Sequence, residues 1–378
     1  MSGEFNYVVP TKLHFGVDIL TQCGSLISGL GKRALLVTMK VEPFMEPSLA
    51  ILRSSLKEAG FEVHGFEGAI PNPTLASVEK GSQLARDLDI DVVIGFGGGS
   101  AMDTAKAIAV GATHEGSLWN YIWSSDTQPT DKTLPIVAIP TTSGTGSQLT
   151  QVSVFTNEDL KYKAAIYNEL IFPAVAIVDP RLMVTTPKAV TAATGFDVFT
   201  HAFESYIHSN SSPIVKTLAK QAIAIVGQYL PVVLEDPHNI EARTQMAFAD
   251  SLAGMCIANA GVTLPHGMGM AIGGFYPNIS HGQALAIVYP EFVKFTESAA
   301  PEAFEMLRNA LAPEASSPLE AIEVFLSKVG LNKKLSDFGA TSSDVSALTE
   351  QCMVLPDYQA NPRVTSSDEM RAIIEAVL

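Results

Sequence analysis

The first half of the chain alternates short apolar runs with longer amphipathic stretches. Continuous apolar runs rich in β-branched residues predict strands, and apolar residues three and four apart predict helices. Strands are expected at Arg33–Met39, Phe61–Phe66, Asp91–Phe96 and Pro135–Ile139. Helices are expected at Pro47–Ala59 and Ala76–Leu88, and from the glycines at 97–99 to about Val110. Alternating strands and helices predict a mostly parallel sheet with helices on both faces.

Beyond Pro187 the strand pattern largely disappears, and alanine, leucine and glutamate recur at helical spacing. Helices are expected at Ala189–His208, Ile214–Leu230, Ile240–Asn259, Gln283–Thr296, Pro301–Leu311, Leu319–Lys328, Ser343–Val354 and Ser367–Val377. The change of pattern predicts an α/β domain over residues 1–184 and an all-α domain over residues 185–378.

One stretch of the second half is long and free of charge. From Ser251 to Pro290 the sequence has no Asp, Glu, Lys or Arg. A membrane span needs about 20 apolar residues without breaks, whereas Pro265, Pro277 and several glycines interrupt this stretch. We therefore expect a buried helix, a turn at Pro265 and further buried segments that wall a pocket.

Composition and charge narrow the class of protein. Of 378 residues, 47% are hydrophobic and 17% are charged, which predicts a soluble globular protein. The formal net charge of −15 argues against nucleic acid or an anionic membrane as a partner. Cys23, Cys256 and Cys352 are widely spaced, and the first residues lack the pattern of a signal peptide. A cytoplasmic location is expected.

Two glycine-rich polar segments follow the third and fourth predicted strands. Gly97–Ser100 opens a helix, where bare backbone N–H groups attract phosphate, and Ser100 and Asp103 have capping-box spacing. Pro140–Ser147 offers hydroxyls and glycines after the next strand. Either segment alone is equally compatible with a tight turn or a polar loop. Two such segments at the carboxyl ends of strands in one sheet favour a nucleotide-binding site.

Three histidines and one aspartate form a candidate metal site. Asp197 and His201 lie four residues apart on a predicted helix and share one face. Alone this pair would be interpreted as a helix salt bridge. His266 and His281, in the uncharged stretch, complete a set suited to zinc or ferrous iron. Glu204 follows on the same helix and is placed to orient a ligand.

These segments also occur together in a known family. The longer motifs are Gly97-Gly98-Gly99-Ser100-x-x-Asp103-x-Ala105-Lys106, Pro140-Thr141-Thr142-x-Gly144-Thr145-Gly146-Ser147, Asp197-x3-His201-Ala202-x-Glu204 and the His-Gly pairs at His266 and His281. Shorter ones are Phe15-Gly16, Pro71-Asn72-Pro73-Thr74, Ala176-Ile177-Val178-Asp179-Pro180 and Asn361-Pro362-Arg363. In this order they span essentially the whole chain, which resembles the iron-containing (group III) alcohol dehydrogenases of the dehydroquinate synthase-like superfamily.

The resemblance implies a Rossmann-like dinucleotide-binding domain, a helical domain for metal and substrate, and a cleft between them. It places the ligands of Fe²⁺, or of Zn²⁺ or another divalent metal, on Asp197, His201, His266 and His281. Contacts to NAD or NADP fall on Met39, Asn72, Gly97, Gly98, Gly99, Ser100, Asp103, Thr141, Thr142, Thr145 and Lys163. The implied reaction is reversible hydride transfer between NAD(P) and a small primary or secondary alcohol or its aldehyde. Relatives commonly form dimers, so a homodimer is expected.

Three positions depart from the family pattern. Met270 stands where many relatives have a histidine suspected of proton transfer, so we assign no catalytic residue beyond the metal ligands. Met39, followed by Lys40, stands where NAD-preferring relatives have Asp, so we expect NADP to be used at least as well as NAD. Gln148 replaces a usual Glu, with no interpreted effect.

Other functions of the same architecture stay open. A polyol dehydrogenase similar to glycerol dehydrogenase and a non-catalytic nucleotide-binding relative are the main alternatives. Dehydroquinate synthase requires several basic residues that the Ser251–Pro290 stretch lacks, and a maleylacetate reductase would not need the full ligand set.

Overall fold

The computed structural model describes residues 4–160 and 162–378, and the chain forms two compact units. The α/β unit is Val9–Thr186, and the helical unit is Pro187–Leu378 together with the segment that ends at Val8. The sequence places residues 4–8 in the first domain, but they group with the helical unit. The reason is local, since Tyr7 packs against the helical core and the Val8 N–H donates to Asn259 Oδ1 at 2.7 Å.

A six-stranded sheet forms the centre of the α/β unit. Its strands are β1 (Lys12–Phe15), β2 (Arg33–Met39), β3 (Glu62–Ala69), β4 (Val92–Gly97), β5 (Ile136–Pro140) and β8 (Val175–Val178). Their order across the sheet is β1-β8-β5-β4-β2-β3, and all of the pairings are parallel. The predicted parallel α/β fold is therefore confirmed.

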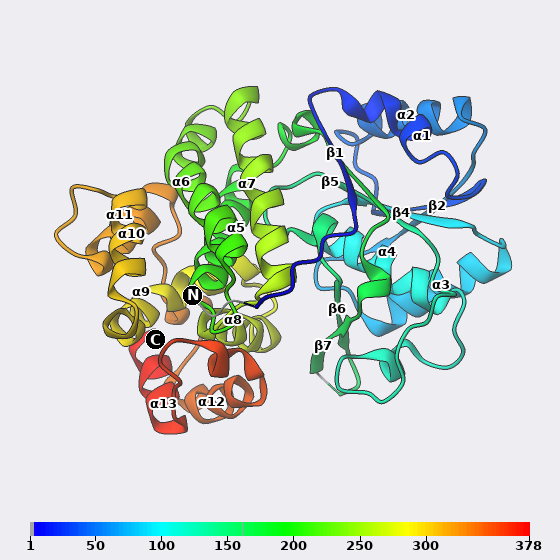
Figure 1. Cartoon of the computed structure of the whole chain (residues 1–378). Coiled ribbons are helices and arrows are strands. Elements are labelled where there is room, and N and C mark those ends of the chain that lie inside the picture. Colours follow the sequence, from blue (N-terminus) through cyan, green and yellow to red (C-terminus); the bar gives the residue numbers. More distant parts are fainter. Residues whose placement is uncertain (1–3, 161) are drawn as a thin grey trace. The chain divides into compact units, whose positions relative to one another are not determined.

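Helices cover both faces of this sheet (Figure 1). They are α1 (Cys23–Leu26), α2 (Glu46–Glu58), α3 (Leu75–Asp87) and α4 (Gly99–Gly111). Leu35 and Val37 of β2 belong to the apolar core that includes α3 and α4, whereas Ala34 and Leu36 belong to the core that includes α1 and α2. Strands buried on both faces have continuous apolar sequences, which is why β2, β4 and β5 were recognisable.

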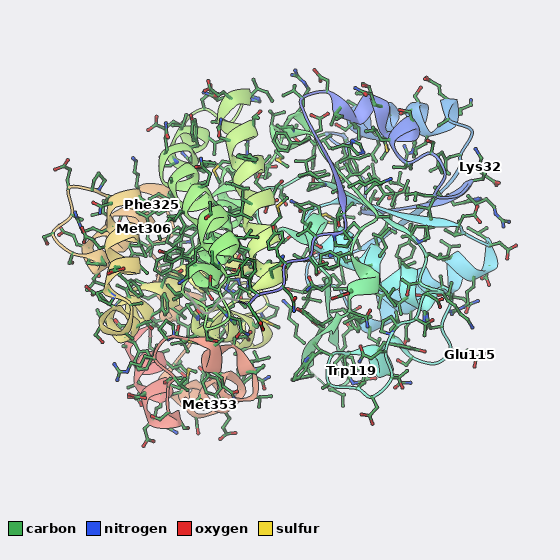
Figure 2. The ribbon with its side chains drawn as sticks, in the orientation of Figure 1. Lys32, Glu115, Trp119, Met306, Phe325 and Met353 are labelled. Atoms are coloured by element: carbon green, nitrogen blue, oxygen red, sulfur yellow. The ribbon has the colours of Figure 1, made fainter. Side chains whose placement is uncertain are left out.

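The sequence pattern missed four strands. β1 and β8 are only four residues long, so they hardly rise above the background of apolar residues. The other two, β6 (Val152–Asn157) and β7 (Tyr162–Tyr167), form an antiparallel hairpin. Trp119, which is labelled in Figure 2, packs edge-on against Phe155 and Tyr162 of this hairpin.

The second unit is helical, as predicted, because every residue from 187 to 378 is described and none lies in a strand. Its helices are α5 (Lys188–Ile207), α6 (Pro213–Glu235), α7 (Ile240–Asn259), α8 (Leu264–Phe275), α9 (His281–Thr296), α10 (Pro301–Leu311), α11 (Pro318–Val329), α12 (Val345–Val354) and α13 (Ser367–Ala376). α6 continues past Pro231, where the sequence predicts its end. Val233 and Leu234 are buried in the core, and this packing outweighs the hydrogen bond that proline removes.

Two parts of the helical unit are apolar enough to be compared with membrane spans. α6 is long and apolar enough to cross a membrane, yet half of its most apolar segment is buried inside the unit, as in the core helix of a soluble protein. α7 and α8 are long and apolar enough to cross a membrane only when they are counted as one span, and a bend of 100° separates them. The uncharged stretch therefore contains the end of α7, a sharp bend, α8 and the start of α9. The turn expected at Pro265 lies just before it, because Pro265 is in the first turn of α8.

Candidate functional site

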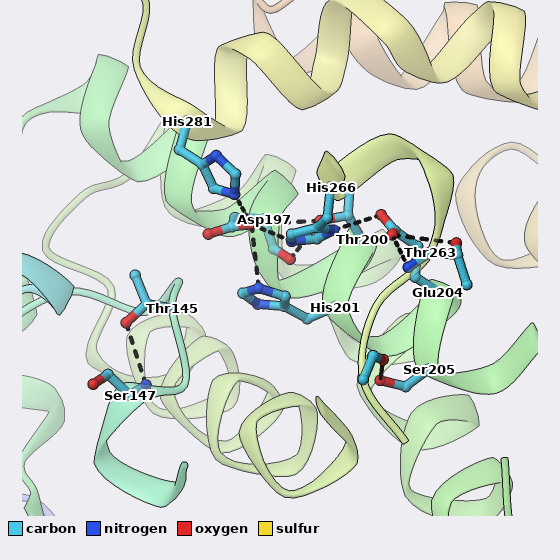
Figure 3. A network of polar contacts seen from close by, with 11 residues as sticks. Thr145, Ser147, Asp197, Thr200, His201, Glu204, Ser205, Thr263, His266 and His281 are labelled. Carbon is cyan, nitrogen blue, oxygen red and sulfur yellow. Dashed lines mark hydrogen bonds and ion pairs between the residues drawn. The ribbon is translucent and has the colours of Figure 1, made fainter. Parts of the chain in front are cut away.

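Asp197 lies at the centre of three imidazoles within the helical unit. Its Oδ1 atom is 3.6 Å from His201 Nε2, 3.6 Å from His266 Nε2 and 3.9 Å from His281 Nε2. The four side chains come from three helices, α5, α8 and α9, and converge from different directions (Figure 3). Asp197, His201 and His266 are buried, and the side chain of His281 is 32% exposed. The structure thus brings Asp197, His201 and His266 within 4.8 Å of one another and places His281 beside Asp197.

The spacing fits a divalent transition metal. Two ligand atoms at about 2.1 Å from a tetrahedrally coordinated ion lie about 3.4 Å apart, close to the two shorter separations. His266 Nε2 is buried and has no hydrogen-bond partner among the residues that the structure describes. A buried nitrogen without a partner is costly unless something accepts its lone pair. The donor set and this nitrogen both fit a bound metal.

Close helix packing sets the position of His281. It is the first residue of α9, and Gly282 follows it against α5. A Cβ atom at position 282 would lie 1.9 Å from the carbonyl oxygen of Ala193, so only glycine allows this approach. The glycine of this His-Gly pair therefore brings the N-terminus of α9 to the helix that carries Asp197 and His201.

Glu204 holds His266 from the side opposite Asp197. Glu204 Oε1 accepts a hydrogen bond of 2.8 Å from His266 Nδ1, and Oε2 accepts from the Thr263 N–H, also at 2.8 Å. Because a carboxylate only accepts, Nδ1 carries a proton and Nε2 is the nitrogen that can face a metal. The role suggested for Glu204 by the sequence thus has a defined geometry.

The electrostatics of the cluster favour an ionised aspartate. Burial would raise the pKa of Asp197, but His201, His281 and His266 outweigh this effect and lower the pKa to about 2. Burial would lower the pKa of His266, but Glu204 and Asp197 raise it to about 10. Asp197 therefore supplies a negative charge that a cation can neutralise.

In the α/β unit, the glycine turn joins β4 to α4. Gly97 has a φ angle of +152°, which side chains rarely allow, and Gly98 is the N-cap of α4. Glycine has no side chain with which to cap this helix, so the N–H groups of Gly99 and Ser100 could bind an anion. A Cβ atom at Gly99 would lie 2.5 Å from Thr145 Cγ2, and one at Gly98 would lie 3.2 Å from Thr142 Oγ1. The glycines therefore let the turn pack closely against the threonine segment, beside helix N–H groups that could bind a phosphate.

The segment after β5 is tied to this turn. The Thr141 N–H donates to the Gly97 carbonyl at 2.9 Å, and the Thr145 hydroxyl accepts from the Ser147 N–H at 3.3 Å (Figure 3). Both glycine-rich segments thus lie at the carboxyl ends of adjacent strands, as predicted for a nucleotide site.

Asp103 differs from its predicted setting. The sequence pairs it with Ser100 in a capping box, but α4 begins at Gly99, so Ser100 is not the N-cap. Asp103 Oδ1 accepts from Ser147 Oγ at 2.7 Å and Oδ2 accepts from the Val154 N–H at 3.0 Å. Both carboxylate oxygens therefore hold the segment after β5 in place.

The remaining predicted cofactor residues lie in two places. Met39 ends β2, next to β4 in the sheet. Asn72 lies in a turn with a φ angle of +53°, and its Oδ1 accepts from Lys163 Nζ at 3.1 Å. This pair and a hydrogen bond of 2.7 Å from the Thr156 N–H to the Pro73 carbonyl join the turn before α3 to the β6–β7 hairpin.

Comparison with known proteins supplies the family. The family described as "Iron-containing alcohol dehydrogenase" matches residues 10–180, and "Fe-containing alcohol dehydrogenase family, C-terminal" matches residues 191–378. The chain belongs to the iron-containing alcohol dehydrogenase family.

Individual relatives match over the whole length. A 1,3-propanediol dehydrogenase of Klebsiella pneumoniae is 34% identical over 98% of this chain and 97% of its own. An NAD-dependent methanol dehydrogenase of Bacillus methanolicus is 31% identical over 99% of this chain and all of its own. The crystal structure of an archaeal halo-thermophilic Red Sea brine pool alcohol dehydrogenase covers both chains completely at 33% identity, with a TM-score of 0.94.

Membership confirms the family, the fold and the reaction class predicted from the sequence. This iron-containing alcohol dehydrogenase is a metal-dependent oxidoreductase that acts on the CH–OH group of an alcohol with a nicotinamide cofactor. The structure itself shows the potential metal site at Asp197, His201 and His266.

Lys106 is a functional candidate to which the sequence analysis assigned no role. It is fully buried, and its Nζ donates to Ser147 Oγ at 2.9 Å, to the Thr150 carbonyl at 2.9 Å and to the Val152 carbonyl at 2.8 Å. A lysine three residues after Asp103, in an otherwise uncharged helix, was the available signal. Lys106 and Asp103 together anchor the segment that carries the threonines to the helix of the glycine turn.

Proposed function

We propose that this dehydrogenase interconverts small primary or secondary alcohols and their aldehydes or ketones. Asp197, His201, His266 and His281 would hold its divalent metal, and the glycine turn would hold the pyrophosphate of NAD(P). The observation that carries the proposal is the convergence of three imidazole nitrogens on Asp197 Oδ1 at 3.6–3.9 Å.

The chain's own residues orient and insulate the site. A divalent ion, when bound to such ligands, acts as a Lewis acid toward the oxygen of the substrate. Glu204 fixes the ring of His266, and Gly282 fixes the position of His281. The absence of Asp, Glu, Lys and Arg from Ser251 to Pro290 suits a neutral substrate and keeps water from a hydride acceptor.

Cofactor binding is assigned to the α/β unit. The N–H groups at the start of α4 would bind the pyrophosphate, with Thr141, Thr142 and Thr145 beside it. Asn72 and Lys163 already contact each other and offer polar groups to the rest of the nucleotide. We propose that Asp103 acts through Ser147, since both of its carboxylate oxygens are engaged there and at Val154.

Met270 supports a reaction without a protein proton carrier on α8. It lies four residues after His266, on the same face of the helix, and its thioether cannot exchange a proton at ordinary pH. The proton would then leave through solvent or the cofactor ribose.

We also propose a cytoplasmic homodimer that binds neither nucleic acid nor a membrane. The net charge of −15 and the three free, buried cysteines support the location and the absence of these partners. The homodimer rests on the resemblance alone, and light scattering during size-exclusion chromatography would test it.

One experiment tests the metal site and the reaction together. Wild type, His266→Ala and the exposed control His238→Ala are loaded with Fe²⁺ or Zn²⁺, and bound metal and alcohol oxidation are measured. We expect His266→Ala to lose both, and His238→Ala to lose neither. Full activity of a metal-free preparation would overturn the proposal.

A panel of substrates distinguishes a dehydrogenase of monohydric alcohols from a polyol dehydrogenase. Monohydric alcohols, diols and glycerol are compared by kcat/KM with NAD and with NADP. A higher kcat/KM for glycerol than for monohydric alcohols would instead support the polyol dehydrogenase.

A further inference from the structure

The strand next to the glycine turn ends without an acidic residue. In open α/β sheets that bind dinucleotides, an acidic side chain near this strand end accepts hydrogen bonds from the adenosine ribose. Here the strand is β2, which lies between β4 and β3 and ends at Met39. Met39 and Lys40 alone would leave the 2′ position of the ribose open to a phosphate.

The neighbouring strand supplies a carboxylate at the same place. Val37 of β2 pairs with Phe66, but Met39 pairs with Ala69, so Thr38 stands opposite two residues, Glu67 and Gly68. Such a β-bulge turns a side chain away from its regular direction. Glu67 Oε2 accepts a hydrogen bond of 3.1 Å from the Val41 N–H, two residues beyond Met39.

The bulge is held by specific contacts. A Cβ atom at Gly68 would lie 2.2 Å from Phe66 Cζ, so the buried Phe66 ring requires glycine there. Ser77 Oγ, in the first turn of α3, donates to the Gly68 carbonyl. Glu67 itself is exposed, with its carboxylate fastened to the chain that follows β2.

We propose that Glu67 replaces the missing acid at position 39 and makes this enzyme prefer NAD(H) to NADP(H). Among the described residues no donor engages Oε1, so it can accept from a ribose hydroxyl, whereas the carboxylate charge repels a 2′-phosphate. The Val41 N–H, a potential donor to that phosphate, is already engaged by Glu67. The exposed Lys40 precedes Val41, and its positive charge would attract a 2′-phosphate and so favour NADP(H). The inference rests on the proposed nucleotide site and reverses the preference expected from Met39 and Lys40.

The test measures cofactor binding by the metal-loaded enzyme. NADH and NADPH are titrated by calorimetry into wild type, Glu67→Gln and Glu67→Lys. Glutamine keeps an acceptor for the Val41 N–H and removes the charge, and lysine reverses the charge on an exposed side chain. We expect wild type to bind NADH more tightly, and the ratio of the NADPH Kd to the NADH Kd to fall at least fivefold in Glu67→Gln and further in Glu67→Lys.

A matched control lies on the same strand. Glu62, at the amino end of β3, is exposed and five residues away, so Glu62→Gln makes the same change in net charge far from the turn. Its Kd ratio should equal that of wild type. Tighter binding of NADPH than NADH by wild type, or a less than fivefold change in both Glu67 variants, would overturn the inference. Failure of wild type to bind either cofactor would overturn the nucleotide site itself.

Discussion

Glu204 and His266, 62 residues apart in the sequence, are joined by a hydrogen bond of 2.8 Å between Oε1 and Nδ1. The bond selects the tautomer of the ring and turns Nε2 toward Asp197. Because Glu204 also accepts from the Thr263 N–H, it fixes the backbone at the start of α8 along with the ring. The geometry of the ligand set therefore depends on a residue that is not itself in the set.

Glu204→Gln should weaken metal binding while the protein stays folded. His266 and Thr263 bind different oxygens of the carboxylate, so in the same side-chain position the NH₂ group of glutamine would face one of the two donors. Loss of such a partner typically lowers metal affinity about 10–100-fold. Competition with a chromogenic chelator would measure this, with the exposed Glu323→Gln as control. An unchanged metal Kd would show that Glu204 does not position the ligand.

Gly99→Ala should weaken binding of NADH. The added Cβ atom would lie 2.5 Å from Thr145 Cγ2, so either the glycine turn or the threonine segment must move. We expect the NADH Kd to rise about tenfold, or about 1.4 kcal/mol, with no change in bound metal. Gly65→Ala is the control, because a Cβ atom there meets nothing within 4 Å. Equal NADH affinity in the two variants would contradict the assigned role of the turn.

Strands β2, β4 and β5 were predictable because burial on both faces makes their sequences continuously apolar. The candidate metal ligands were predictable because an uncharged stretch gives little other reason for His266 and His281. The position of Glu67 was not predictable from the sequence, since it follows from a bulge that Phe66, Gly68 and Ser77 hold in place. The hydrogen bonds of Asp103 were not predictable either, because its partners Ser147 and Val154 reach it only when the segment after β5 packs against α4.

Lys106→Met should destabilise the α/β unit. It would leave Ser147 Oγ, the Thr150 carbonyl and the Val152 carbonyl without the donor that the ammonium group supplies. Unsatisfied buried acceptors cost about 1–3 kcal/mol each, so we expect a loss of about 3 kcal/mol after partial relaxation. Denaturant unfolding of this variant and of exposed Lys80→Met would show the difference. A loss as small as that of Lys80→Met would remove Lys106 from its anchoring role.

The titration of Lys106 should also make the stability of the protein depend on pH. Burial lowers the pKa of Lys106 from 10.5 to about 8, although Asp103 opposes the shift. Between these values the unfolded chain binds more protons than the folded one, so this group makes the free energy of unfolding rise with pH. Wild type should therefore gain stability relative to Lys106→Met from about pH 8 to 10.5. A flat difference across this window would contradict the shift.

The short segment before Val9 has a consequence for how the protein is made. Asn259 binds Val8 through two hydrogen bonds, one to its N–H and one to its carbonyl, so the helical unit contains chain from both sides of the α/β unit. In topological terms the α/β unit is an insertion in a discontinuous helical one. During synthesis on the ribosome, residues 9–186 can fold as soon as they emerge, whereas residues 4–8 must wait for α7 before they find their partner.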